Sequence, residues 1–232
     1  MRDLYDLITV DDLHKDEASI IKVLQEIKAK RLKSGINLLN YYKELPINME
    51  ATVLMVDQGV VDLKVSSLQA AAMYAQRITF IKSRHFAHDV VAKVQRVNFK
   101  EDIVFLTQFS YVKIKSEQRH SVRVRISDKL DVSFRNEYHH IEGTVRDISL
   151  DGVAVINPDM ISFEDGELGI VSFSLNGQNH EIPGRFLRMT EDAELFLYII
   201  VLENDIKSER VLSKYVFEQQ IAIINELKKV AK

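Results

Sequence analysis

The stretch that decides the fold runs from Arg119 to Ile156 and reads RHSVRVRISDKLDVSFRNEYHHIEGTVRDISLDGVAVI. β-Branched and aromatic residues alternate in it with polar ones, and short polar segments interrupt the alternation. A period of two is typical of strands that bury one face. It predicts four strands, at residues 122–126, 130–134, 140–147 and 153–156.

The same pattern continues towards the C-terminus and then gives way to a helical one. Three more strands are predicted at 167–174, 180–189 and 195–202, and Asn176-Gly177 predicts a tight hairpin between the first two. Seven short strands at this spacing favour a barrel or a sandwich. A helix is predicted from Ile206 or Ser208 to Val230, with Ser208 as its cap and one mostly apolar stripe facing inward. The stripe consists of Val211, Leu212, Tyr215, Val216, Gln219, Ile223 and Leu227.

The N-terminal half predicts a second small β-domain that follows a helix. Residues 16–32 show the apolar spacing of a helix, with Gly35 as the expected stop. Ser67 is expected to cap a short helix over 67–75. Strands are predicted at 37–42, 53–56, 60–65, 77–82, 90–98 and 103–109. The fold class is therefore mainly β: two small β-barrel domains in tandem, with an N-terminal helix and a C-terminal helix.

A polar and charged segment at 113–121 marks the expected boundary between the two domains. It divides the chain into an N-terminal helical segment (1–35), a first β-barrel (36–114) and a second β-barrel with its C-terminal helix (115–232).

The composition excludes several classes of function. The chain has 232 residues and a net charge of −3, so its overall charge does not attract it to DNA or RNA. It has no cysteine, which excludes disulfides, thiolate metal sites and a cysteine nucleophile. No apolar run is long enough for a transmembrane helix or resembles a signal peptide, so we expect a cytoplasmic protein.

Two short motifs carry the chemistry. The first, Arg119-His120-Ser121-Val122-Arg123, lies at the domain junction, and the second, Asp147-Ile148-Ser149-Leu150-Asp151-Gly152, ends a strand. Positions i and i+4 of an extended chain point the same way, so the two guanidinium groups can converge on one phosphate or stack on a flat base. The Asp147 carboxylate suits the N–H donors of a guanine edge, and Gly152 lets a bulky ring approach. This set of residues suits a flat, anionic ligand with guanine-like donors.

Residues 117–230 resemble a PilZ domain. The matching motifs are RxxxR at Arg119 and Arg123, and [D/N]xSxxG at Asp147, Ser149 and Gly152. Residues 36–114 resemble the N-terminal split-barrel domain of YcgR-like flagellar brake proteins in their strand pattern and position.

The resemblance implies a receptor for cyclic di-GMP rather than an enzyme, with the five motif residues binding the dinucleotide and no metal expected. Gln118 and Arg125 are further candidate contacts. The chain has Glu117-Gln118 where many family members have a third basic residue. Binding at this arm is expected to reorient the two domains and so regulate motility or surface attachment. The resemblance also implies a protein partner, such as the flagellar motor, and leaves a homodimer open.

Two other interpretations stay open. The chain can be a nucleotide-independent scaffold that oligomerises through its helices, which Glu117-Gln118 and Asp151 favour. It can also be a metal-dependent enzyme that uses His85 and His88, although their i, i+3 spacing suits a helix better than the loop expected there.

Overall fold

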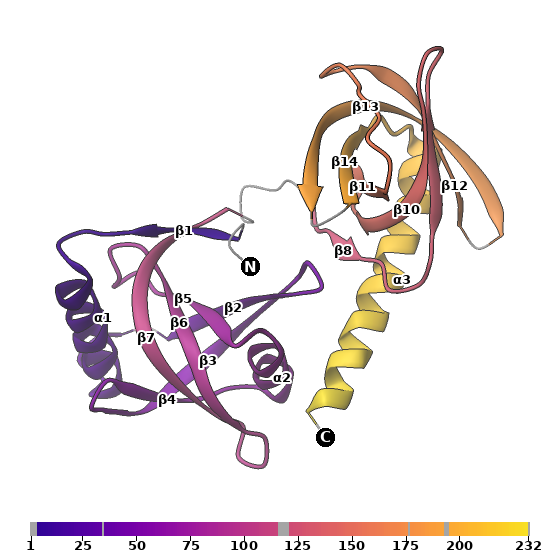
Figure 1. Cartoon of the computed structure of the whole chain (residues 1–232). Coiled ribbons are helices and arrows are strands. Elements are labelled where there is room, and N and C mark those ends of the chain that lie inside the picture. Colours follow the sequence, from indigo (N-terminus) through magenta and orange to yellow (C-terminus); the bar gives the residue numbers. More distant parts are fainter. Residues whose placement is uncertain (1–3, 34, 116–120, 176, 193–194, 232) are drawn as a thin grey trace. The chain divides into compact units, whose positions relative to one another are not determined.

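The computed structural model describes residues 4–33, 35–115, 121–175, 177–192 and 195–231. Its backbone contacts divide the chain into two compact units. One unit consists of Met1–Tyr42, Pro46–Arg119 and Ile223–Lys232, and the other consists of Lys43–Leu45 and His120–Ala222. The fold class is mainly β with three helices, as the sequence predicts (Figure 1).

The strands of the first unit form a closed ring. The elements, in chain order, are β1 (Tyr5–Ile8), α1 (Leu13–Lys28), β2 (Ile36–Tyr42), β3 (Leu45–Asp57), β4 (Val60–Lys64), α2 (Ser67–Gln76), β5 (Ile78–Lys82), β6 (Asp89–Asn98) and β7 (Ile103–Ile114). Their order in the sheet is β1-β7-β4-β3-β2-β5-β6, and β6 also pairs with β7. Six strands therefore close into a barrel, while β1 lies against β7 outside the ring.

Apolar side chains fill this barrel because alternate strand positions point inward. Leu38, Leu63, Ile81 and Leu106 are fully buried there, and α1 adds Ile20 and Leu24 to the same core. The tight turn between β3 and β4 has positive φ at both Gln58 and Gly59, which matches the twist of a two-residue hairpin.

Both ends of α1 and the cap of α2 differ from the sequence-based prediction. Helix α1 begins after Asp12, whose carboxylate accepts a hydrogen bond from the Lys15 backbone N–H. It ends at Lys28 because Lys30 adopts a positive φ and the Arg31 N–H bonds back to the Glu26 carbonyl, so Gly35 is not its stop. Ser66, rather than Ser67, caps α2 by accepting from the Gln69 N–H.

The second unit repeats the closed arrangement with other strands. These are β8 (Val124–Arg125), β9 (Asp131–Arg135), β10 (His140–Ile148), β11 (Gly152–Asn157), β12 (Leu168–Leu175), β13 (Gln178–Asp192) and β14 (Leu195–Leu202). Their order is β11-β14-β13-β12-β9-β10-β8, and β11 also pairs with β10. The hairpin predicted at Asn176-Gly177 is confirmed, because Leu175 pairs directly with Gln178; Asn176 itself lies outside the described residues.

Helix α3 (Ile206–Val230) ends the chain. Asp205 caps the helix, since its carboxylate accepts a hydrogen bond from the Ser208 backbone N–H at 2.7 Å. The Ser208 hydroxyl oxygen in turn accepts a hydrogen bond from the Asp205 backbone N–H at 2.9 Å. The cap is thus Asp205 and not Ser208. Four residues of the predicted inward stripe are buried, namely Leu212, Val216, Ile223 and Leu227. Among the described residues, no helix is both long and apolar enough to cross a membrane.

Candidate ligand site

The first motif leads directly into a strand. Arg119 and Gln118 lie outside the described residues, so the structure places only the later part of this arm. Arg123 and Arg125 alternate with Val124 and Ile126, which are 0% and 9% exposed. Because successive residues of an extended chain point to opposite sides, both arginines share the side away from the core.

The strand that carries Arg125 pairs with the strand that carries the second motif. Asp147 of β10 lies directly opposite Arg125 of β8, and the Ile126 N–H donates to the Arg146 carbonyl at 2.9 Å. The two motifs are 24 residues apart in sequence, and this pairing brings them together in space.

A β-bulge sets the direction of the Asp147 side chain. The pairing between β10 and β11 shifts between Val145 and Asp147, which leaves Arg146 as the extra residue. Val145 and Ile148 are both buried in the core, and the extra residue places Asp147 on the other face of the sheet. Bulges of this kind re-aim side chains next to functional sites.

Asp147 is a buried carboxylate with a charged neighbour. Its side chain is 4% exposed, and its Oδ2 accepts a hydrogen bond of 2.9 Å from Arg146 Nε. The Arg146 side chain is 25% exposed, so one side of this ion pair remains in contact with solvent. A buried carboxylate held in one orientation is suited to recognising a fixed pair of N–H donors.

The rest of the second motif forms a tight turn between β10 and β11. The Ser149 N–H donates to the Gly152 carbonyl at 2.9 Å, and the Ser149 hydroxyl donates to the same oxygen at 3.3 Å. Ser149 is 3% exposed, so its hydroxyl here serves the turn itself.

The end of β14 fastens this turn from outside the motif. The Leu202 N–H donates to the Asp151 carbonyl at 3.0 Å, and Asn204 Nδ2 donates to the Leu150 carbonyl at 2.5 Å. The Oδ1 atom of Asn204 is buried and has no hydrogen-bond partner among the described residues. Asn204, the residue before the α3 cap, therefore links the turn to the segment that leads into α3.

Gly152 is required by close packing. A Cβ atom at this position would lie 2.8 Å from the Ile200 carbonyl oxygen, which belongs to the backbone of the neighbouring strand. No side chain fits there unless β11 and β14 move apart.

Sequence reasoning missed two residues at this place. Arg146 directly precedes the motif, but its role depends on the bulge, for which local sequence gives no signal. Asn204 is more than fifty residues downstream, and only the pairing of β11 with β14 brings it to the turn.

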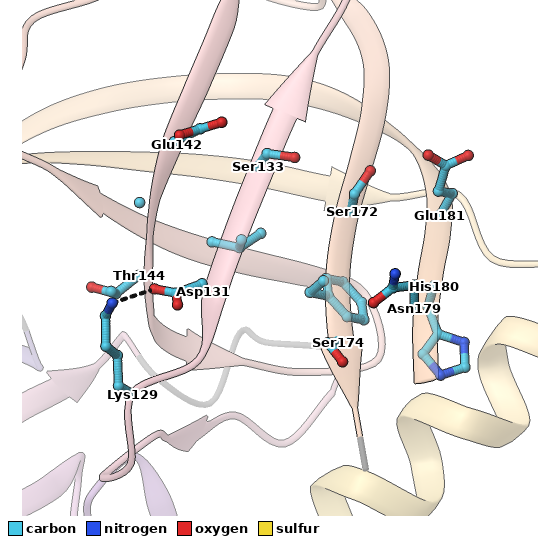
Figure 2. A pocket seen from close by; sticks show the side chains of 13 residues that line it. Lys129, Asp131, Ser133, Glu142, Thr144, Ser172, Ser174, Asn179, His180 and Glu181 are labelled. Carbon is cyan, nitrogen blue, oxygen red and sulfur yellow. Dashed lines mark ion pairs between the residues drawn. The ribbon is translucent and has the colours of Figure 1, made fainter. Parts of the chain in front are cut away.

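Two of the surface cavities that border the described part of the second barrel bear on the motifs. A cavity of about 460 Å³ lies beside the motifs, with Arg125, Lys129 and Arg146 as its cationic residues and Asp128 as its acidic one. A wider groove of about 750 Å³ crosses the outer face of β10, β9, β12 and β13 (Figure 2). Small hydroxyl side chains such as Ser133 and Ser172 line that groove, and none of the predicted ligand residues does. The cavity with Arg125 and Arg146 lies next to the strand pairing that joins the two motifs, and Arg125 is the predicted ligand residue that lines it.

The histidine pair does not assemble a metal site within the described part of the chain. Described residues contain no group of three or more His, Cys, Asp or Glu side chains that could hold a metal ion. His85 and His88 lie in the loop between β5 and β6, where the His88 ring packs edge-on against Tyr111.

Comparison with solved structures gives several likenesses of low identity. The Bacillus subtilis inhibitor of motility MotI/DgrA is 14% identical with a TM-score of 0.44, over 81% of this chain and 96% of that one. Escherichia coli YcgR in complex with c-di-GMP is 12% identical with a TM-score of 0.45, over 92% and 95%. The K. pneumonia MrkH–c-di-GMP complex is 13% identical with a TM-score of 0.42, over 90% and 96%.

Comparison with curated proteins gives no match. Comparison with protein families gives a direct one: residues 117–218 match the PilZ domain. The match contains both motifs, the paired strands β8 and β10 that bring them together, and all the other strands of the second barrel. The chain therefore contains a PilZ domain, which residues 117–218 constitute.

Proposed function

We propose that this protein is a cyclic di-GMP-binding effector whose PilZ domain holds the dinucleotide between the arm and the β10–β11 turn. The observation that carries the proposal is the pairing of Arg125 with Asp147, which puts the described end of the arginine arm next to the buried carboxylate. The PilZ match and the c-di-GMP named for YcgR and MrkH agree with this ligand.

The chemistry of the site suits each part of such a ligand. The Asp147 carboxylate accepts from the N–H donors on a guanine edge, which are the donors that adenine lacks in that arrangement. Arg119 and Arg123 hold phosphate oxygens in a bidentate manner or stack on a base. Arg125 and Arg146, which line the same cavity, add positive charge close to Asp147. A binding role needs no catalytic group, so we propose a receptor and not an enzyme.

We infer the effect of binding from the place of the arm in the sequence. Residues 116–123 connect the first barrel to the second in sequence, so fixing this segment on a ligand restricts the relative placement of the domains. The altered surface would act on a protein partner in motility or surface attachment. We place this function in the cytoplasm, where a cyclic dinucleotide messenger is met.

The matched variants Arg123→Ala and Arg135→Ala test the proposal by calorimetric titration with cyclic di-GMP. Arg123→Ala is expected to weaken binding by roughly tenfold to a hundredfold, since a good bidentate arginine contact contributes about 1–3 kcal/mol. Arg135→Ala removes an equal charge from β9 of the same barrel and is expected to bind like the wild type. Equal loss in both variants, or none in either, would contradict the proposed site.

A specific observation favours a second candidate function, assembly through α3. Phe217 and Ile221 lie four residues apart on this helix and are 60% and 44% exposed. Exposed apolar pairs at this spacing can pack against another helix. Light scattering distinguishes the candidates: an oligomer that cyclic di-GMP leaves unchanged, in a protein that binds no nucleotide, would select the scaffold.

A further inference from the structure

The outer face of the second barrel carries a trough that follows β12. Val171 and Phe173 of this strand are 0% and 4% exposed and belong to the core. Since alternate residues of a strand point to opposite faces, the others form a line on the outside. They are, in order, Leu168, Ile170, Ser172 and Ser174. The groove of Figure 2 covers the serine end of this line, and a cavity of about 620 Å³ covers the leucine end.

The two ends of the trough offer different contacts. At the serine end, Ser133 of β9 lies directly opposite Ser172, so small hydroxyl side chains form the floor. At the other end, Ile170 lies opposite the exposed Pro183 of β13, and the Leu168 side chain is 62% exposed. An exposed apolar group with a polar surround is typical of a protein-interaction site.

The charges along the trough are mainly negative. The carboxylates that line its two cavities belong to Asp131, Glu137, Glu142, Glu181 and Glu203. Among the described lining residues, the cations are Lys129 and Arg135. Lys129 Nζ lies 2.9 Å from Asp131 Oδ1, and Arg135 Nη2 lies 3.0 Å from Glu181 Oε1, so each cation already offsets one carboxylate. The excess negative charge is complementary to a basic partner.

The ion pair of Arg135 with Glu181 crosses the trough. Arg135 belongs to β9 and Glu181 to β13, and β12 lies between these two strands. The two side chains are 57% and 60% exposed, and ion pairs exposed to this extent are held weakly. A cation of a partner is therefore able to replace Arg135 on Glu181.

The dimensions of the trough fit an α-helix. The six residue steps from Leu168 to Ser174 span about 20 Å, which is the length of a helix of about 13 residues. The two strand spacings from β9 to β13 give a width of about 10 Å, which is the diameter of a helix with its side chains.

We propose that the β12 trough is the docking site for a basic amphipathic helix of a partner protein. Apolar side chains of that helix pack against Leu168 and Ile170. Its lysine and arginine side chains meet the carboxylates on both sides of the trough, including Glu181 once Arg135 has been displaced.

This docking site is separate from the candidate ligand site. In the closed ring, β12 is separated from β10 by β9, and from β11 by β13 and β14. A helix on β12 and a nucleotide at the β10–β11 turn therefore occupy different sides of the barrel. The inference goes beyond the proposed function and does not depend on nucleotide binding.

The test uses the full chain and two labelled synthetic helices of about 14 residues, one of leucine and lysine and one of leucine and glutamate. Fluorescence anisotropy measures their binding, and the basic helix alone is expected to bind. Leu168→Ser is expected to weaken that binding roughly tenfold, because it removes the apolar anchor. Leu7→Ser is the matched control, since it removes a leucine that is 64% exposed on β1 of the other unit, and it is expected to bind like the wild type.

A second pair of variants tests the ion pair across the trough. Arg135→Gln frees Glu181 and is expected to strengthen binding of the basic helix roughly twofold to fivefold. Arg96→Gln makes the same change of charge on β6 of the first unit and is expected to leave the affinity unchanged. A general attraction between opposite charges would instead raise the affinity equally in both variants.

Three results would overturn the docking site. They are no binding of the basic helix at about 1 mM, equal binding of the two helices, and wild-type affinity in Leu168→Ser. Loss of affinity in Leu168→Ser with none in Leu7→Ser supports it. The thermal unfolding midpoint of each variant is measured alongside, and an unchanged midpoint shows that lost affinity reports on the surface and not on the fold.

Discussion

Arg146 Nε donates a 2.9 Å hydrogen bond to Oδ2 of Asp147, the next residue in the chain. The two residues lie at the β-bulge where the pairing of β10 with β11 shifts by one residue. The Asp147 side chain is 4% exposed, so it has lost most of its hydration, and this charged hydrogen bond offsets part of that loss. Adjacent residues on a regular strand point to opposite faces and could not pair in this way. The bulge therefore supplies the carboxylate and its cation together.

Replacing Arg146 tests this relationship. Arg146→Gln is expected to lower the free energy of unfolding by about 1–3 kcal/mol, because it leaves a buried carboxylate without its charged partner. Asp147→Asn added to the same chain is expected to restore part of the loss, since the group left behind is then neutral. Urea denaturation at pH 7 measures both values. Additive losses in the double variant would show that the two side chains do not act as a pair.

The second prediction concerns the close approach of β11 and β14. Gly152→Ala places a Cβ atom 2.8 Å from the Ile200 carbonyl oxygen, so one strand must move. We expect a loss of about 1–3 kcal/mol in unfolding free energy, together with weaker binding of cyclic di-GMP. Gly35→Ala is the matched control, because nothing lies within 4 Å of a Cβ there and its unfolding free energy is expected to change little. Wild-type stability in Gly152→Ala would show that the strands separate without cost.

The third prediction concerns pH and the N-terminus of α3. Hydrogen bonds from the Ser208 hydroxyl and backbone N–H hold the pKa of Asp205 below its usual value of 3.8. A carboxylate whose pKa is lowered by folding stabilises the protein at pH values above its unfolded pKa. That stabilisation is lost as the pH falls through the lower, folded pKa.

Asp205→Asn keeps a capping side chain but cannot ionise. The wild type is therefore expected to exceed this variant in stability at neutral pH and to lose that advantage as the pH falls below the usual carboxyl pKa of 3.8 and through the lower, folded pKa. Thermal unfolding of both chains between pH 2.5 and pH 7 measures the difference, and a constant difference across that range would contradict the prediction.

The fourth prediction compares two apolar residues of α3. Leu212 is 0% exposed and Phe217 is 60% exposed. Leu212→Ala is expected to cost about 2–5 kcal/mol, because it removes buried methyl groups and leaves a cavity. Phe217→Ala is expected to change the unfolding free energy of the isolated chain little. A large loss in Phe217→Ala that depends on protein concentration would instead show that this face is buried in an oligomer.

Local pattern predicted most strands because one face of each is buried. The alternation in β9, β10 and β14 predicted the bounds of each strand to within a residue or two. The Asn176-Gly177 pair predicted the hairpin that joins β12 to β13. The pattern missed β1, whose four residues show no clear alternation and are held by pairing with β7. Pairing partners, unlike strand periodicity, are not encoded in a short window.

The helix ends show the same limit. Helix α1 ends where Lys30 adopts a left-handed conformation. Glycine adopts that conformation more readily than lysine, so the sequence predicted the end of the helix at Gly35 instead. The cap of α3 was misassigned by three residues, because Asp205 and Ser208 bond to each other reciprocally and either is a good capping residue by type.

The sequence likewise predicts some residues of the candidate site and not others. Asp147, Ser149 and Gly152 could be named from the sequence because they stand within six residues of each other. Arg146 could not, because the bulge in β10 determines where it points, and Asn204 could not, because only the pairing of β11 with β14 brings it to the turn.

The central claim is tested most directly by calorimetric titration of the wild-type chain, at about 100 µM, with cyclic di-GMP and then with cyclic di-AMP. The account predicts saturable binding of cyclic di-GMP with micromolar or tighter affinity, and no comparable binding of cyclic di-AMP, whose adenine edge does not offer Asp147 the same donors. No heat with cyclic di-GMP at this concentration, or equal binding of the two dinucleotides, would contradict it.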